Sequence, residues 1–127
     1  MAEIKRILLL DDSSITLEME KAVLEERGYK VAAAANLLEF QEQLDQFQPE
    51  IILTDLMMPD ISGKDIVRVL KQDFHTEKIP IVLFSSKTEE ELAEIAEQAG
   101  ADGYLSKSQG IDKLGDMVDE LVDSILW

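Results

Sequence analysis

The sequence predicts an α/β fold, in which helices cover both faces of a parallel β-sheet. Short apolar runs of strand length alternate with longer segments whose apolar residues recur at helical spacing, and this pair repeats five times. The apolar runs are nearly continuous, which is typical of strands buried on both faces of a parallel sheet. Strands that alternate with helices in this way form one sheet between two helical layers, with right-handed crossovers.

Three expected strands lie in the first half of the chain, at residues 7–10, 29–34 and 51–53. The first helix has Ser13 or Ser14 as its N-cap and ends at Gly28. Its expected apolar positions are Ile15, Met19, Val23 and Leu24. The second helix begins after the cap residue Asn36 and ends before Pro49, and its expected apolar positions are Phe40, Leu44 and Phe47.

The second half of the chain contains two further strands, at residues 81–84 and 104–105. A loop and the start of the third helix are indicated by Pro59, Ser62 and Gly63, and the apolar stripe of that helix is Ile66, Val67 and Leu70. A very acidic helix spans residues 88–99, with Thr88 as its cap and Gly100 as its end. The last helix spans 111–126, with apolar positions Leu114, Met117, Val118, Leu121, Val122 and Ile125.

Length and composition restrict the possible functions. The 127 residues suit a single domain, and the absence of cysteine excludes disulfides, thiolate metal sites and a cysteine nucleophile. A net charge of −15 repels nucleic acid and anionic lipid, so we expect no direct nucleic-acid binding and no membrane contact. No signal peptide or spanning run is evident, and we therefore expect a cytoplasmic protein.

Polar residues end four of the five expected strands. Asp11 and Asp12 follow the first strand and Asp55 the third, while Ser85 ends the fourth and Lys107 follows the fifth. In an open α/β sheet, ligands bind at the carboxyl ends of the strands, where these five side chains converge. Taken alone, each of these residues is more often a cap, a turn residue or a solvated charge. Their occurrence together at the ends of four different strands is specific for a ligand-binding site.

The chemistry of this set indicates phosphoryl transfer. Three crowded carboxylates repel one another, and Mg²⁺ is the natural cation for a few carboxylates and waters. A carboxylate can act as a nucleophile toward phosphorus and form an aspartyl phosphate. The cation, Lys107 and the Ser85 hydroxyl would neutralise charge on the phosphoryl oxygens.

Four segments together resemble the response-regulator receiver family of two-component signalling, including its chemotaxis-regulator-like members, over essentially all of residues 1–127. They are residues 8–13 (LLLDDS), 53–59 (LTDLMMP, with Gly63 after it), 81–86 (IVLFSS) and 100–107 (GADGYLSK). The resemblance implies one receiver domain with a flavodoxin-like, doubly wound (βα)5 fold and strand order 2-1-3-4-5.

The resemblance also implies a role for each residue of the site. Asp55 would be the phosphoacceptor, and Mg²⁺ would be held by Asp11, Asp12, Asp55 and the backbone carbonyl of Met57. Lys107 would bind the phosphoryl group, Ser85 would be the switch hydroxyl and Tyr104 the switch aromatic. Such a domain assists its own phosphorylation and dephosphorylation and is not otherwise an enzyme.

The partners that the resemblance implies are a histidine kinase or phosphotransfer protein and a downstream protein or output domain. We expect the output surface to be formed by the acidic fourth helix, the fifth strand and the last helix, and we also consider a homodimer through that surface. Two residues depart from the family pattern: Ser108 replaces the usual proline after Lys107, and Ser86 replaces a smaller residue. A non-proline cis bond costs about 2.5–4 kcal/mol, which favours a trans Lys107–Ser108 bond.

Other functions fit the sequence less well. A phosphorylation-independent interaction module with the same fold is the main alternative. A metal-dependent phosphatase commonly has a second aspartate two residues after the nucleophile, where this chain has Met57. A flavin or dinucleotide site is disfavoured, because no glycine-rich phosphate loop follows the first strand.

Overall fold

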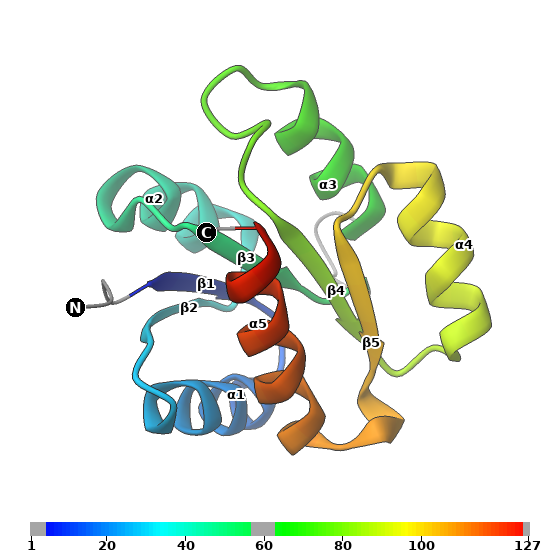
Figure 1. The fold of residues 1–127 in the computed structure, drawn as a ribbon. Coiled ribbons are helices and arrows are strands. Elements are labelled where there is room, and N and C mark those ends of the chain that lie inside the picture. The colour runs from blue at the N-terminus through cyan, green and yellow to red at the C-terminus, as the bar shows by residue number, and fades with distance from the viewer. Residues whose placement is uncertain (1–4, 57–62, 126–127) are drawn as a thin grey trace.

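The fold is a five-stranded parallel sheet between two layers of helices (Figure 1). The computed structural model describes residues 5–56 and 63–125. The strand order is β2-β1-β3-β4-β5, with all four neighbouring pairs parallel. This order confirms the expected flavodoxin-like topology. The strands are β1 (Arg6–Leu10), β2 (Lys30–Ala34), β3 (Ile51–Thr54), β4 (Ile81–Ser85) and β5 (Gly103–Ser106).

Five α-helices alternate with the strands, as predicted. They are α1 (Ser14–Glu26), α2 (Leu37–Phe47), α3 (Gly63–Gln72), α4 (Glu89–Ala99) and α5 (Ile111–Ile125). Ser13, Asn36 and Thr88 are the N-caps of α1, α2 and α4, and Thr88 forms a full capping box with Glu91. The sequence did not indicate the short 3-10 helix η1 (Lys107–Gln109), which follows β5 directly. The predicted loop residues Pro59 and Ser62 lie outside the described residues.

Each face of the sheet has its own apolar core. Helices α2, α3 and α4 cover one face with side chains that include Phe40, Val67 and Leu92. Helices α1 and α5 cover the other face, where Leu24 and Leu114 are fully buried (Figure 1). The central strands have apolar residues on both faces, which explains their continuous apolar runs.

The predicted apolar face of α1 is partly wrong. Ile15 and Met19 were expected to face the core, but 70% and 50% of their surfaces are exposed. The buried residues of this helix are Leu17, Glu20 and Leu24, which share a face at spacings of three and four residues. The sheet and α5 lie against this second face, so the position of the neighbouring elements decides which stripe is buried.

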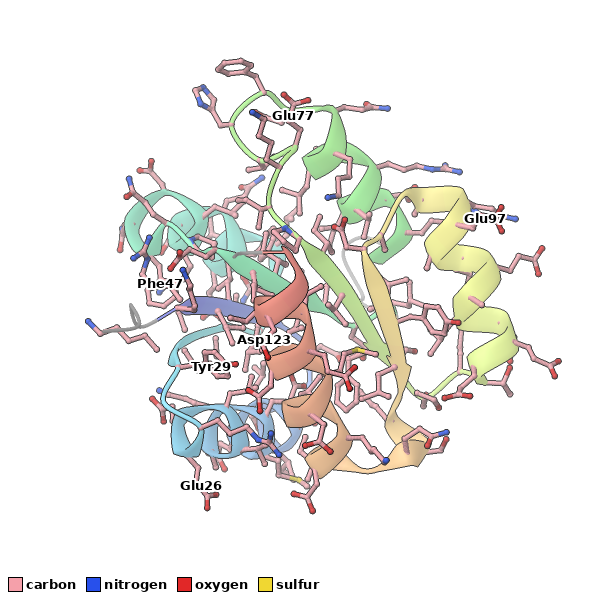
Figure 2. The ribbon with its side chains drawn as sticks, viewed as in Figure 1. Glu26, Tyr29, Phe47, Glu77, Glu97 and Asp123 are labelled. Atoms are coloured by element: carbon pink, nitrogen blue, oxygen red, sulfur yellow. The ribbon has the colours of Figure 1, made fainter. Side chains whose placement is uncertain are left out.

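Polar contacts fasten the amino-terminal half of the chain to α5. The Arg27 guanidinium donates to Asp119 at 2.6 Å and to Asp116 at 3.0 Å, and the Tyr29 hydroxyl donates to Asp119 at 2.5 Å. Figure 2 shows Tyr29 and Asp123 on the two sides of this junction. These contacts join the end of α1 and the start of β2 to α5.

No helix in the described ranges 5–56 and 63–125 combines the length and the apolar composition needed to cross a membrane.

Candidate functional site

The backbone brings Asp11 and Asp55 together at the carboxyl edge of the sheet. Strands β1 and β3 are neighbours, with Leu10 paired to Thr54. The parallel pattern continues past the strand ends, because the backbone N–H of Asp55 donates to the carbonyl of Leu10 at 2.9 Å. Both aspartates therefore leave the sheet at the same level, as their positions after two buried strands predict.

Three carboxylates form a compact cluster there. Asp11, Asp12 and Asp55 each offer an oxygen atom within 4.8 Å of the others. Asp11 and Asp55 are buried, whereas Asp12 is exposed. The cluster thus contains two fixed oxygens and one that faces solvent. This all-oxygen, acidic set fits a hard divalent cation that keeps part of its water shell.

Local hydrogen bonds orient the two buried carboxylates. One oxygen of Asp11 accepts from the backbone N–H of Ser13 at 2.9 Å. One oxygen of Asp55 accepts from the backbone N–H of Leu56 at 2.7 Å. In each residue the second oxygen, Oδ2, is directed toward the same ammonium group, that of Lys107.

Lys107, which follows the edge strand β5, contacts the carboxylates of both Asp11 and Asp55. Its Nζ lies 2.8 Å from Oδ2 of Asp11 and 3.1 Å from Oδ2 of Asp55, and 5.7 Å from the centre of the Phe84 ring. Burial lowers the pKa of Lys107, but the hydrogen bond to Asp11 and the charges of Asp55 and Asp11 outweigh it and raise this pKa above its usual value. Lys107 is therefore a fixed positive charge at neutral pH.

The serine after Lys107 does not prevent this contact. The peptide bonds of residues 5–56 and 63–125 are all trans, including the bond between Lys107 and Ser108. The chain turns there through η1, and the Ser106 hydroxyl caps it by accepting from the N–H of Ser108. The expected trans bond is thus confirmed, and Lys107 reaches the carboxylates with it.

The two expected switch residues, Ser85 and Tyr104, lie on the neighbouring strands β4 and β5. Ser85 is fully buried at the end of β4, and its hydroxyl accepts from the backbone N–H of Lys87 at 3.5 Å. Tyr104 is half-buried on β5 and packs against the core on the α4 side. Ser86, the second departure from the family pattern, is exposed. Met57, the predicted carbonyl ligand, lies outside the described residues.

Sequence reasoning missed Glu20, a buried carboxyl group next to this cluster. Glu20 is 3% exposed, and among the described residues no hydrogen bond or ion pair involves its side chain. Burial, and then the charge of Asp11, raises the pKa of Glu20 to about 8; Lys107 lowers it and Asp55 raises it further. Its spacing from Leu17 and Leu24 was the signal that would have placed it on the buried face.

Comparisons with known proteins agree with this geometry. The family model of the response regulator receiver domain matches residues 7–119. The phosphate regulon transcriptional regulatory protein PhoB of Pseudomonas aeruginosa is 36% identical over 103 residues, which cover 81% of this chain and 45% of PhoB. The Myxococcus xanthus gliding motility regulatory protein is 33% identical over 117 residues, 91% of this chain and 15% of that protein.

Solved structures show the same fold. The receiver domain of a response regulator from Bermanella marisrubri is 32% identical and superposes with a TM-score of 0.82, over 94% of this chain and 99% of that one. The chemotaxis response regulator CheY4 of Vibrio cholerae gives a TM-score of 0.84 at 24% identity, over 94% and 99% of the two chains, and this likeness concerns the fold alone.

The chain spans less than half the length of the curated relatives named above. The match to the family model nevertheless includes four of the five strands completely, all of β1 except Arg6, and α5 up to residue 119. It also includes Asp11, Asp12, Asp55, Ser85 and Lys107. This chain therefore belongs to the response regulator receiver domain family, the receiver part of two-component regulators.

Proposed function

We propose that this domain is a phosphorylation switch in which Asp55 accepts the phosphoryl group. The observation that carries the proposal is the convergence of Lys107 on Asp11 and Asp55, at 2.8 and 3.1 Å. Asp55 has one oxygen tied to the Leu56 N–H and the other directed to Lys107. A phosphoryl group attached to that second oxygen lies next to a positive charge that is already in place.

Asp11, Asp12 and Asp55 would hold Mg²⁺ through carboxylate oxygens. The three oxygens lie within 4.8 Å of one another, and the ammonium group of Lys107 contacts two of these three carboxylates, those of Asp11 and Asp55. When bound, Mg²⁺ neutralises the charge that develops on the phosphoryl oxygens. The backbone carbonyl of Met57 stays a predicted further ligand.

The proposed reaction is an in-line displacement at phosphorus. A carboxylate oxygen of Asp55 forms a bond to phosphorus while the bond to the donor's leaving group breaks, for example the P–N bond of a phosphohistidine. Lys107 and the Ser85 hydroxyl stabilise the equatorial oxygens. Water later cleaves the acyl phosphate, which restores the Asp55 carboxylate and releases inorganic phosphate. The domain assists both steps on itself and has no other substrate.

The phosphoryl donor would be a histidine kinase or a phosphotransfer protein. The reaction would take place in the cytoplasm. Two exposed apolar side chains, Ile15 and Met19, lie one turn apart in the first half of α1, the helix that follows Asp12 in the chain, and would provide an apolar contact for a donor protein. The proposed output surface consists of α4, β5 and α5, and its reader would be an output domain, a separate protein or a second copy. Glu97 projects from the outer side of α4 (Figure 2).

The test is phosphorylation by a small donor. Incubation with Mg²⁺ and acetyl phosphate should add one phosphoryl mass to the intact protein, and Asp55→Asn should abolish this gain. Asp45→Asn, on exposed α2 surface, is the matched control and should be labelled like the wild type. Undiminished labelling of Asp55→Asn would refute the assignment. The alternative, an interaction module that works without phosphorylation, is not favoured, because the acidic residues and the lysine are all in place.

A further inference from the structure

Ser106, the residue before Lys107, has a buried hydroxyl with three polar neighbours. It ends β5 and is 1% exposed. Its Oγ donates to the carbonyl of Lys87 at 2.8 Å, lies 2.8 Å from Oγ of Ser108, and accepts from the N–H of Ser108 at 3.4 Å. Because a serine hydroxyl has a single proton, the Ser108 hydroxyl is the donor in the contact between the two serines.

The Lys87 backbone is shared by the two loops that contact the phosphoryl site. Its N–H donates to the Ser85 hydroxyl at 3.5 Å, and its carbonyl accepts from Ser106. Ser85 and Ser106 are also paired across β4 and β5, so the two loops start from the same level of the sheet. One peptide segment thus connects the Ser85 hydroxyl with the residue that precedes Lys107.

We propose that Ser106 is a positioning residue that joins the Ser85 loop to the Lys107 loop, so that both groups respond to a phosphoryl group together. The inference rests on the proposed function of Asp55. It adds a coupling element that lies behind the phosphoryl ligands and does not touch the phosphoryl group.

The geometry gives this hydroxyl two tasks. It caps η1, the turn on which Lys107 sits, and so fixes the direction from which the ammonium group reaches Asp11 and Asp55. It also holds the carbonyl of Lys87. When the Ser85 hydroxyl turns toward a phosphoryl oxygen, it gives up its long contact with the Lys87 N–H, and the bond between Lys87 and Ser106 transmits that movement to β5.

The test separates phosphoryl binding from metal binding. Ser106→Ala should weaken binding of beryllofluoride, a phosphoryl mimic, at saturating Mg²⁺ by about three- to tenfold, as expected for the loss of one buried hydrogen bond. Mg²⁺ affinity should stay within about twofold, because the substitution removes no carboxylate and the two buried ones, Asp11 and Asp55, keep their hydrogen bonds to backbone N–H groups. Ser106→Thr keeps the hydroxyl and should restore beryllofluoride binding. Equal losses in both titrations would indicate general damage and overturn the proposal.

Thr76→Val is the matched control. The Thr76 hydroxyl also donates to a backbone carbonyl, that of Leu70 at 2.6 Å, but it lies before β4, at the opposite end of the sheet from Asp55. This variant should lose stability without changing beryllofluoride binding. Thermal unfolding of each variant shows whether it is folded before it is titrated.

A double-mutant cycle tests the coupling itself. If Ser106 acts with Ser85, the losses of beryllofluoride affinity in Ser85→Ala and Ser106→Ala should not add in the double variant. Strict additivity would overturn the proposal. A wild-type protein that takes up no phosphoryl group would instead refute the proposed function, whereas normal wild-type labelling with an unaffected Ser106→Ala would refute this inference alone.

Discussion

The ammonium nitrogen of Lys107 lies 2.8 Å from Oδ2 of Asp11, the carboxylate that follows β1. In the metal-free protein, Lys107 therefore neutralises part of the charge that would attract a cation. Under the proposed function, Lys107 and Mg²⁺ would compete for the same carboxylates, and both would stabilise the phosphoryl group. This relationship predicts opposite effects of one substitution on two kinds of ligand.

Lys107→Met should bind Mg²⁺ more tightly and phosphoryl mimics more weakly. Removing the competing charge should tighten Mg²⁺ binding about two- to fivefold, the range of a partly exposed ion pair. Beryllofluoride binding and labelling by acetyl phosphate should fall, because a phosphoryl ligand is lost. NMR titrations with each ligand measure both effects. Lys30→Met, an exposed lysine of β2, has the same charge change and should alter neither. Weaker Mg²⁺ binding in Lys107→Met would contradict the competition.

Asp12→Ala should weaken Mg²⁺ binding by at least about tenfold, since it removes a carboxylate from the proposed first coordination sphere. Phosphorylation by acetyl phosphate should be lost together with Mg²⁺ binding. The metal-free protein should be as stable as the wild type or more so, because repulsion with Asp11 and Asp55 is relieved. Asp45→Ala matches the change in net charge. An Mg²⁺ titration indistinguishable from wild type would exclude Asp12 as a ligand.

Ser85→Ala should separate phosphorylation from signalling. The variant keeps Asp55 and the acidic cluster, so it should still gain one phosphoryl mass. A phosphoryl group adds about −1.5 to −2 charge units, and the missing hydroxyl can no longer respond to them. Amide shifts on addition of beryllofluoride should then disappear from residues 88–107 but persist around Asp55. Ser85→Thr should retain them. If Ser85→Ala showed the same amide shifts as the wild type, the Ser85 hydroxyl would have no switching role.

The buried Glu20 should make stability depend on pH. Its pKa in the folded protein is about 8, against about 4.5 in the unfolded chain, so the folded state binds the proton more tightly. The contribution of the protonated Glu20 carboxyl group to folding stability is complete below about pH 4.5 and is lost as pH rises through 8. In that window the free energy of unfolding should fall by roughly 1.4 kcal/mol per pH unit.

Glu20→Gln should remove this dependence, because the amide keeps the shape of the protonated acid and does not ionise. We expect the variant to be more stable than wild type at pH 8 by a few kcal/mol, measured by urea unfolding without Mg²⁺. Glu18→Gln, an exposed neighbour on α1, is the control. Parallel stability profiles of wild type and Glu20→Gln between pH 5 and 8 would show that the Glu20 carboxyl is not responsible.

Much of the fold and of the site was predictable because it depends on local sequence. The continuous apolar runs of β1, β3 and β4 require burial on both faces, and Ser13, Asn36 and Thr88 can satisfy exposed N–H groups at helix starts. A parallel sheet brings its carboxyl ends to one edge, so residues that follow strands must meet there. Asp11, Asp55 and Lys107 do so.

Only the tertiary structure decided which stripe of α1 is buried and how the two loops behind the site are joined. Ile15 and Met19 repeat at helical spacing as well as Leu17 and Leu24 do, and the choice depends on where the sheet and α5 lie. The contact between Ser106 and the Lys87 carbonyl joins residues 19 positions apart through one particular turn. The sequence by itself determined the strands, the caps and the residues of the reactive edge, because these follow from local burial and hydrogen bonding. Contacts between elements depend on three-dimensional packing, which no local pattern encodes.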